Sequence, residues 1–533
     1  MCRVVRFLLA LAVAITATGP QAPAASAHPD ELVFGAVGEF KNLNPLYLYG
    51  GARQALGPMV FNSLLGIDAH GVLHASIARE VPSLANGGVS RDGLDVTYHL
   101  RHDAKWADGE PLTSRDVLFT HQAVMNPRNT VAERYGDREI ATIGAPDPYT
   151  VRVHLKRSFS PFVAYFDRPL LPAHLLDKFD SLDKVDYNQH PIGSGPYRVA
   201  EWARGDHITF VASDAYWGPR AHIAKIVVHF IPDANTLVAE LQSHDINAIL
   251  NLDPTRVKSI AGDLDARVVK TPEQLFGLFI FNTADARLAD VRVRRAFILG
   301  IDRAQVIQKA TGGLEYTDRP SRALFGWAYD PSVRPLPYDP KAAAKLLDTA
   351  GWKLGADGVR ARGSLRLEFN LAIQAGHPVF AVEAAQVAEQ AKALGIALDI
   401  KASVDQQFAL LTPEGTLAGG HFDISLTRFV GGEADPDPDW LIGCDETGKP
   451  NAYNFTHMCL PGMAPVLDDA VATFDIARRK RDYAIVQRAL NEQLPLVLIS
   501  QSLAIDVVPK GLHGFVRSEF GGALLNVGSW TLQ

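Results

Sequence analysis

A helix signal with sharp ends, followed directly by a strand signal, constrains the fold of this chain most. His377-Pro378 precedes a helical run over 379–394, and Gly395 follows it. Proline is favoured at the first position of a helix and glycine just beyond its last, because these residues avoid or satisfy the unpaired backbone groups there. Residues 396–402 then alternate apolar and polar side chains, which is typical of a strand. The segment therefore predicts the helix-to-strand half of an α/β unit.

Further helix and strand signals alternate along the chain without a simple repeat. Asp339-Pro340 precedes a second helical run over 341–350, which ends at Gly351. An aspartate at this position accepts hydrogen bonds from the first backbone N–H groups of a helix. Short strands bounded by turn residues are predicted over 95–100, 150–155, 208–212, 225–231, 365–373, 396–402 and 422–429. We predict a mixed α/β protein.

The N-terminus has the pattern of a secretory signal. Two arginines precede an apolar run over 7–15, and the small residues Ala25-Ser26-Ala27 follow as a cleavage site. The apolar run is too short to span a membrane. We expect residues 1–27 to be removed and the mature protein to reach the periplasm. Cys2 precedes the apolar run, so it cannot be the lipid-bearing cysteine of a lipoprotein, and a protein without a lipid anchor is expected.

Charge and cysteine content narrow the function classes. Removal of residues 1–27 takes away two arginines and no acid, so the formal net charge changes from −7 to −9. A chain with this balance offers no extended basic face to neutralise phosphates, which argues against nucleic acid as a partner. The two remaining cysteines, Cys444 and Cys459, are predicted to form a disulfide in an oxidising compartment.

Catalytic and metal-binding patterns are missing from the sequence. There is no His-Glu-x-x-His motif and no glycine-rich loop of the phosphate-binding type. Gly193-Ser194-Gly195-Pro196 lacks the spacing of a nucleophile elbow and predicts a tight turn into a strand that starts at Tyr197. The histidines are scattered without cysteine or carboxylate partners at ligand spacing. We therefore predict no catalytic residue, no metal site and no cofactor.

An acidic, proline-rich loop follows the strand predicted over 422–429. Ala434–Leu441 contains three carboxylates, including Asp435 and Asp437, and two prolines. Proline fixes its own φ angle and disfavours helix at the residue before it, so the carboxylates are expected on a stiff loop. Binding groups concentrate on such loops at the ends of strands. The alternative interpretation is an acidic turn that only faces solvent.

Several separated segments together resemble the bacterial extracellular solute-binding proteins of family 5, which serve peptide and nickel ABC transporters. They occur in the order of the family and run from about residue 32 to the end of the chain. The matching segments are Asn42–Leu46, Val60–Leu65, Leu100–Thr113, Gly193–Tyr197, Ala215–Gly218, Asp290–Ala296, Ile301–Arg303 and Tyr338–Pro340. Each segment alone is a weak signal, whereas the ordered set is specific.

The resemblance implies a two-lobed periplasmic-binding-protein fold of type II, in the large class that carries an extra subdomain in lobe I. Lobe I would comprise 28–275 and 496–533, with the subdomain at about 70–190, and lobe II would comprise 276–495. The stretches Phe276–Phe281 and Leu494–Ile499 are expected to flank the two crossings between the lobes. Closure of the lobes about these crossings would enclose a ligand.

The resemblance also implies how a peptide would be held. Asp435 is the best match for the aspartate that pairs with the free α-amine of a peptide, and Asp437 is the second choice. An ammonium group enclosed in a cleft must be paired, and a carboxylate forms a strong charge-assisted hydrogen bond with it. Tyr49-Gly50-Gly51 and Arg428-Phe429 match the segments that bind the peptide backbone in the family.

Two further positions are implied with alternatives. Trp327 lies where other members place an aromatic residue of the cleft, and packing in the core of the lobe is the alternative. His377 aligns with an arginine that contacts the ligand carboxylate in dipeptide-binding members. A histidine is a weaker and titratable anion partner, and a structural role at the start of a helix is the alternative.

The expected function is that of a periplasmic substrate-binding protein, without enzymatic activity. It would act as a monomer that captures a small peptide or peptide-like solute and delivers it to an inner-membrane ABC permease with its ATPase subunits. The alternatives are a binding protein for a nickel chelate, haem or another non-peptide solute, and a ligand sensor for a chemoreceptor. An exported hydrolase that uses Asp435 and Asp437 as a carboxylate pair is a further alternative.

Overall fold

The protein is described here from a computed structural model. It describes residues 31–48, 51–131, 134, 136–166, 168–260, 265–431, 434–444, 449–450 and 453–533. The predicted signal at 1–27 and two predicted site residues, Tyr49 and Gly50, lie outside these ranges. Among the described residues, no helix is long and apolar enough to cross a membrane.

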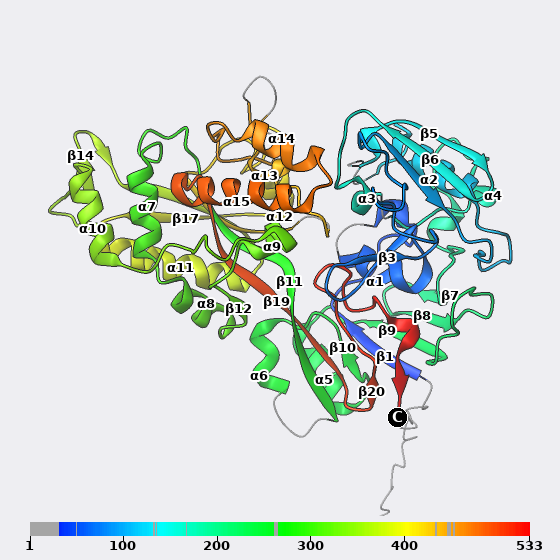
Figure 1. Ribbon diagram of the computed structural model, residues 1–533. Coiled ribbons are helices and arrows are strands. Elements are labelled where there is room, and N and C mark those ends of the chain that lie inside the picture. The colour runs from blue at the N-terminus through cyan, green and yellow to red at the C-terminus, as the bar shows by residue number, and fades with distance from the viewer. Residues whose placement is uncertain are drawn as a thin grey trace, which may run out of the picture.

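One mixed sheet extends through the whole molecule, in the order β17-β16-β18-β11-β19-β10-β1-β9-β8-β7, with β12 beside β19 (Figure 1). Parallel pairs join β1 to β9 and β10, and join β16 to β17 and β18. The strands are β1 Glu31–Ala36, β7 Tyr197–Ala203, β8 His207–Ala212, β9 Lys225–Phe230, β10 Ala248–Ile249, β11 Ala266–Phe281, β12 Glu315–Tyr316, β16 Glu368–Gln374, β17 Ala397–Ser403, β18 Ile424–Val430 and β19 Leu496–Pro509. The mixed α/β class predicted from the sequence is confirmed.

The long strands β11 and β19 connect two bodies, which Figure 1 shows on either side of them. Lobe I contains β1 and β7–β10, and lobe II contains β16–β18. The antiparallel pairing of β11 with β19 is interrupted between Pro272 and Phe276, where the register shifts. The lobe limits that we predicted at 275/276 and 495/496 lie close to this interruption and at the start of β19, and they stay a prediction.

Lobe I is covered by α1 and by the C-terminal segment. Its core includes Leu32 and Phe34 of β1 and Trp530 near the C-terminus, and the ring centroids of Phe34 and Trp530 lie 6.3 Å apart. The other elements of this lobe are α1 Gly51–Val60, α5 Ala234–Ser243, α6 Val257–Ile260, β20 Leu512–His513 and β21 Thr531–Leu532. The C-terminal segment therefore completes the core that the N-terminal strand begins.

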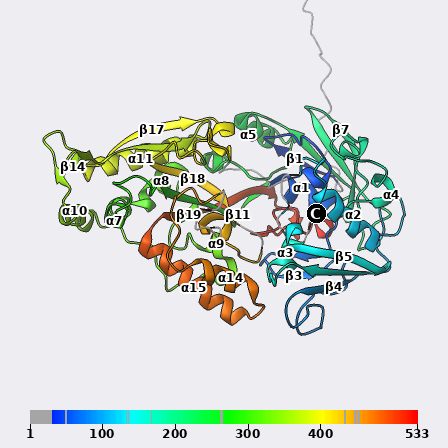
Figure 2. The same cartoon turned by 90° about the horizontal axis from the view of Figure 1, so that it is seen from above.

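A separate three-stranded sheet, in the order β4-β6-β5, lies within the range predicted for the extra subdomain. It has its own core, which includes Tyr98, Trp106 and Phe162. Its elements and the adjoining hairpin are β2 Leu65–Ile67, β3 Leu73–Ala75, β4 Asp95–His99, α2 Ser114–Met125, β5 Ile140–Asp147, β6 Thr150–Leu155, α3 Phe162–Tyr165 and α4 Ala173–Leu176. Figure 2, seen from above, shows these elements at the end of the molecule opposite to β14 and α10.

Lobe II buries both faces of its part of the sheet. Phe279 and Phe281 of β11 pack into one core with Phe297, whereas Phe276 and Leu278 pack into another with Phe325. This alternation follows from the two-residue period of a strand. The other elements of lobe II are α7 Val291–Gly300, α8 Arg303–Thr311, α9 Arg322–Phe325, α10 Pro340–Thr349, β13 Lys353–Leu354, β14 Arg360–Arg362, β15 Leu365–Arg366, α11 Pro378–Ala393, α12 Asp405–Ala409, α13 Asp439–Ile442, α14 Ala464–Ala472 and α15 Ile476–Gln493.

The two predicted helices are confirmed, and one predicted strand is interrupted. The Asp339 carboxylate accepts a hydrogen bond from Ala342 N at 2.9 Å and caps α10, whereas the His377 side chain forms no capping bond at α11. The strand predicted over 365–373 is divided at Leu367 into β15 and β16. The N–H group of Leu367 donates to Arg360 O of β14, whereas its carbonyl oxygen accepts from Ala397 N, the first residue of β17. The chain therefore passes from the small sheet to the main sheet at Leu367.

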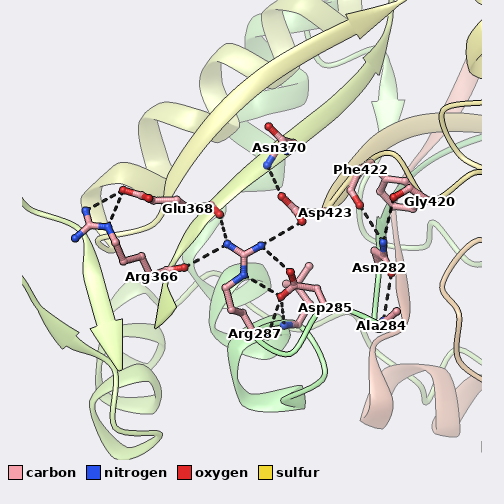
Figure 3. A network of polar contacts seen from close by, with 11 residues as sticks. Asn282, Ala284, Asp285, Arg287, Arg366, Glu368, Asn370, Gly420, Phe422 and Asp423 are labelled. Atoms are coloured by element: carbon pink, nitrogen blue, oxygen red, sulfur yellow. Dashed lines mark hydrogen bonds and ion pairs between the residues drawn. The ribbon is translucent and has the colours of Figure 1, made fainter. Parts of the chain in front are cut away.

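A polar network fixes the start of lobe II's first helix to the sheet (Figure 3). The guanidinium of Arg287 lies 2.6 Å from Asp285 Oδ2 and 3.2 Å from Asp423 Oδ1, and it stacks over the ring of Phe369 at 4.5 Å. The other carboxylate oxygen of Asp423 accepts a hydrogen bond from Asn370 N at 2.8 Å. The loop before α7, β16 and the loop before β18 are thereby joined through one arginine.

The turn predicted at Gly193–Pro196 is confirmed, and it leads into β7. Asn62 N donates to the Ser194 hydroxyl at 3.1 Å, and Gly195 N donates to Val60 O at 2.9 Å. A Cβ atom on Gly193 would lie 1.8 Å from the same Val60 carbonyl oxygen. The glycine is therefore required because α1 approaches the backbone of this turn.

Gly193→Ala is expected to lower the free energy of unfolding by about 2 kcal/mol or more, because the new methyl group would displace backbone atoms. Thermal or urea unfolding followed by circular dichroism would measure the loss. Gly144→Ala is the matched control, because a Cβ atom on Gly144 would have no neighbour within 4 Å. An equal loss for the two variants would contradict the packing argument.

Candidate ligand-binding site

A cavity of about 1690 Å³ lies between the lobes. This volume exceeds the range of about 300–1000 Å³ that is usual for sites of drug-sized ligands. Leu46, Phe61 and Phe520 of lobe I contribute to the wall, and so do Phe429 and Trp440 of lobe II. The cavity therefore has room for a ligand of more than one amino-acid residue, in contact with both lobes.

Four aromatic rings form one side of the cavity in lobe II, and we call them the aromatic wall. They belong to Phe429, Trp440, Tyr453 and Phe455, and all four residues line the cavity. Phe429 is on β18, Trp440 is on α13, and the other two lie in the loop between the cysteines. The wall thus unites three segments that are separate in the sequence.

The predicted disulfide between Cys444 and Cys459 is present, with the two Cα atoms 5.8 Å apart. The buried side chain of Asn454 donates hydrogen bonds to Gly443 O at 3.0 Å and to Met458 O at 3.1 Å. These contacts join the two ends of the loop and flank Tyr453 and Phe455. The loop part of the aromatic wall is therefore held both covalently and by hydrogen bonds.

Most charged groups that line the cavity are arginines. The arginines are Arg101, Arg134, Arg138, Arg168 and Arg428. Asp68 is the one acidic side chain among the described lining residues, and hydrogen bonds from Val72 N and His70 N lower its pKa. The lining therefore presents more guanidinium groups than carboxylates, although carboxylates outside the lining pair with Arg101, Arg168 and Arg428 and compensate part of their charge.

Two of these arginines are held in place by contacts in lobe I. Arg168 Nη2 lies 2.9 Å from Asp137 Oδ2, a buried carboxylate that also contacts His121 Nδ1 at 2.8 Å. Arg101 pairs with Asp103 at 2.9 Å. Only part of their hydrogen-bonding capacity is used by these carboxylates, since a guanidinium has five N–H donors.

Arg428, predicted as a binding residue, lines the cavity but is paired with two buried carboxylates. Its Nη2 atom lies 2.6 Å from Glu383 Oε1 and 2.7 Å from Glu315 Oε1. Burial raises the pKa of Glu383 to about 7, although the Arg428 guanidinium acts in the opposite direction. The same carboxylates raise the pKa of Arg428 against the effect of its own burial. The guanidinium therefore links β18 to α11 and β12 inside lobe II.

Asp435, predicted as the anchor for an amine, is paired with Arg479 of α15. Arg479 Nη2 lies 2.7 Å from Asp435 Oδ1, and Nη1 donates to Oδ2 at 2.8 Å. Arg479 is 1% exposed. Burial lowers the pKa of its guanidinium, the nearby Asp435 carboxylate raises it, and the net direction is upward. Asp435 does not line the cavity among the described residues. This pairing gives it a structural role, and its role as an anchor stays a prediction.

Three other predicted site residues, Asp437, Trp327 and His377, also lie away from the cavity wall. Asp437 is 3% exposed, and its carboxylate accepts a hydrogen bond from Asp439 N at 3.2 Å. Trp327 packs on Tyr483, with ring centroids 6.3 Å apart, in the core of lobe II. His377 is exposed at the start of α11, and its Nε2 atom lies 3.8 Å from Asp405 Oδ1. Gly51 begins α1.

Of the predicted residues whose surroundings the structure describes, Arg428 and Phe429 line the cavity, whereas Asp435, Asp437, Trp327 and His377 do not. Sequence reasoning missed Trp440, Tyr453 and Phe455. A signal existed for them, because Trp440 lies in the acidic loop and the other two lie between the paired cysteines. No comparable signal marked Arg168, and Arg101 lies in the family segment Leu100–Thr113 without a predicted binding role. Within the described ranges, no group of three His, Cys, Asp or Glu residues could hold a metal ion.

A family model described as bacterial extracellular solute-binding proteins, family 5 Middle, matches residues 79–451, which is more than half of the chain. The chain belongs to this family. The resemblance inferred from its ordered segments is thereby confirmed. The family is one of extracellular solute-binding proteins and is not defined by an enzymatic reaction.

Relatives and solved structures match nearly the whole chain. Protein XP55 of Streptomyces lividans is 27% identical over 481 residues, which cover 89% of this chain and 84% of the relative. The oligopeptide-binding protein AppA of Bacillus subtilis is 25% identical over 515 residues, with 94% and 91% covered. The crystal structure of NikZ from Campylobacter jejuni in complex with Ni(L-His) has a TM-score of 0.78 at 23% identity, with 95% of this chain and 100% of that chain covered. The expected two-lobed fold of type II is confirmed.

Loss of the disulfide is expected to destabilise lobe II. Replacement of Cys444 and Cys459 by serine should lower the free energy of unfolding by about 3 kcal/mol, because the unfolded chain regains the freedom of the closed loop. Urea unfolding of the mature protein without reductant would measure the change. Free thiols at both positions in the mature, non-reduced protein would contradict the prediction.

Stability is expected to depend on pH through Glu383. Its pKa is raised from 4.5 to about 7 in the folded protein, so the folded state binds an additional proton between these pH values. The stabilisation is therefore complete below about pH 4.5 and is lost as the pH rises through 7, with a magnitude on the order of 1–3 kcal/mol.

Urea unfolding between pH 5 and pH 8 would measure this loss. Glu383→Gln should show a smaller fall in stability over that interval than the native protein. Glu389→Gln is the matched control, because Glu389 is on the same helix and is exposed. Equal pH slopes for all three proteins would contradict the assignment to Glu383.

Proposed function

We propose that this protein captures a small peptide or peptide-like solute between its lobes and delivers it to an inner-membrane ABC permease with its ATPase subunits. The observation that carries the proposal is a large cavity lined by residues of two lobes, which the paired strands β11 and β19 connect. The similarity to an oligopeptide-binding protein over 94% of the chain supports peptides as the ligand class. We propose that the mature protein works in the periplasm as a monomer and carries no lipid anchor.

The residues that line the cavity indicate how a ligand would be captured. Residues of both lobes line the cavity, so a ligand that contacts both walls favours the closed arrangement over the open one. The permease would then distinguish the loaded from the empty protein by the relative position of the lobes. A change of this kind requires no covalent step and no cofactor.

The positions of the two candidate carboxylates argue against a hydrolase. The Asp435 carboxylate is already paired with Arg479, and Asp437 is 3% exposed. A pair of catalytic carboxyl groups must face the substrate with water between or beside them. We therefore keep the binding function as the proposal.

The arginines favour a second candidate, a non-peptide solute that carries carboxylate groups, such as a metal chelate or haem. Five arginines and one aspartate line the cavity among the described residues, and two histidines, His74 and His222, also line it. Guanidinium groups bind carboxylates in a bidentate manner, which suits an anionic ligand. This charge pattern is less suited to a ligand whose main anchor is a cation.

Native mass spectrometry of the protein purified from its own host would separate the candidates. A retained mass that matches a peptide supports the first proposal, and a metal signal in elemental analysis together with a visible absorption band supports the second. Isothermal titration calorimetry with pooled di- and tripeptides is the complementary test. Absence of binding in every peptide pool, together with a retained metal complex, would contradict the peptide proposal.

The role of Asp435 can be tested apart from its effect on stability. Asp435→Asn is expected to lower the free energy of unfolding by about 3 kcal/mol, because Arg479 would keep a buried charge without its partner. The double variant Asp435→Asn/Arg479→Met removes both charges and should recover much of this loss.

Peptide affinity in the double variant then decides the role. If Asp435 anchors the peptide amine, calorimetry should show a loss of at least about tenfold in affinity even where stability has recovered. Full affinity in the double variant would show that the carboxylate serves only the ion pair.

A further inference from the structure

The rings of the aromatic wall form a closed circuit. The centroid distances are 5.9 Å between Phe429 and Trp440, 5.7 Å between Trp440 and Tyr453, 6.1 Å between Tyr453 and Phe455, and 6.3 Å between Phe455 and Phe429. Three of these contacts are edge-to-face and the fourth is stacked, and all lie within the favourable range for aromatic pairs. Each ring therefore orients its two neighbours.

The circuit is a surface of the cavity and not a closed core. Tyr453 is 39% exposed, and Phe429 and Trp440 are partly exposed. All three line the cavity, so the exposed parts of their rings face a space that a ligand can enter. Apolar surface in contact with water is unfavourable, and a ligand that covers it gains free energy.

Neighbouring side chains extend this apolar surface across the cavity. Leu411 and Val430 of lobe II are 44% and 51% exposed, and Val516 of lobe I is 44% exposed. All three also line the cavity. A flat apolar group against the aromatic wall would therefore be covered from the other lobe when the lobes close.

The aromatic wall is rigid before a ligand arrives. Phe429 of β18 is paired in register with Phe276 of β11, and the side chain of Phe276 is fully buried. Tyr453 and Phe455 lie in the loop closed by the disulfide and by the hydrogen bonds of Asn454. A preformed surface loses little conformational entropy on binding, which favours selection by shape.

The charge of the cavity decides which planar group suits the wall. The face of an aromatic ring attracts cations, and it also packs favourably against apolar rings. Asp68 is the one acid among the described lining residues, so the wall offers a cation a single carboxylate, whereas five arginines, three of them already paired with carboxylates, offer N–H donors to an acidic group. An uncharged ring satisfies the wall without opposing the arginines, and an acidic group elsewhere on the ligand would complement them.

We propose that the aromatic wall is a specificity subsite that takes an uncharged aromatic group of the ligand. The ligand class would be peptides with an aromatic side chain or aromatic carboxylates. The inference rests on the proposed function only in that the cavity between the lobes is the ligand site. It adds a preference for ligands with an aromatic group, which the capture of solutes alone does not require.

Isothermal titration calorimetry with matched probes tests this preference. One pair consists of tripeptide pools that have either phenylalanine or alanine at one fixed position, examined at each of the three positions in turn. The other pair consists of indole-3-acetate and acetate. We expect the aromatic member of at least one pair to bind the native protein at least tenfold more tightly than the other member.

Variants connect this preference to the wall. Trp440→Ala and Tyr453→Ala should each remove most of the preference, whereas Trp440→Phe should retain it. Tyr338→Ala is the matched control, because Tyr338 is 50% exposed and does not line the cavity. Thermal unfolding of each variant would exclude a loss of folding as the cause.

Three results would overturn the inference. The first is the absence of aromatic preference in both pairs. The second is a preference that survives both alanine substitutions. The third is tighter binding of a 4-(trimethylammonio)phenyl probe than of its uncharged tert-butyl analogue. Failure of the proposed peptide function is distinguishable, because peptide pools would then not bind at all while the carboxylate pair would still report on the wall.

Discussion

The antiparallel pairing of β11 with β19 is the constraint on which the other features of this protein depend. These two strands belong to both lobes, and their backbone hydrogen bonds hold the lobes in one sheet. The pairing is interrupted between Pro272 and Phe276, and proline cannot donate a hydrogen bond to a neighbouring strand. This part of the connection between the lobes is therefore held by fewer backbone hydrogen bonds than the regularly paired parts of β11 and β19. Gln274 lies in it and lines the cavity, so the connection between the lobes contributes to the cavity wall.

Ion pairs in lobe II engage Arg428 and Asp435, two of the charged residues that we predicted to contact the ligand. Arg428 binds Glu383 and Glu315, and Arg479 binds Asp435. A buried guanidinium without a carboxylate would be costly, so each pair fixes the position of the strand or loop that carries it. The groups that remain available to a ligand are the aromatic wall on lobe II and the arginines on lobe I. Under the proposed function, the lobe II side of the cavity would select the ligand by shape and the lobe I side would select it by charge.

The sequence predicted the local elements well, but it did not predict which side chains line the cavity. The capped helices at 341–350 and 379–394, the turn at Gly193–Pro196 and the disulfide depend on residues that are near one another in the chain, and all were confirmed. The predicted strand over 365–373 was wrong at Leu367, because the change between two sheets depends on partners from distant segments. For the same reason the acidic loop suggested that the Asp435 carboxylate was free to bind a ligand, whereas it pairs with the guanidinium of Arg479 from α15.

The sequence by itself determined the mixed α/β class, the family and the two-lobed fold, because ordered motifs, capping residues and periodicity are properties of the chain. Only the tertiary structure decided which side chains meet in the cavity. Phe429, Trp440 and Tyr453 lie in different segments, and their rings face one space because β18, α13 and the disulfide-closed loop pack together. A ligand site between two lobes is built from long-range contacts, and the linear sequence does not state which distant partner each side chain meets.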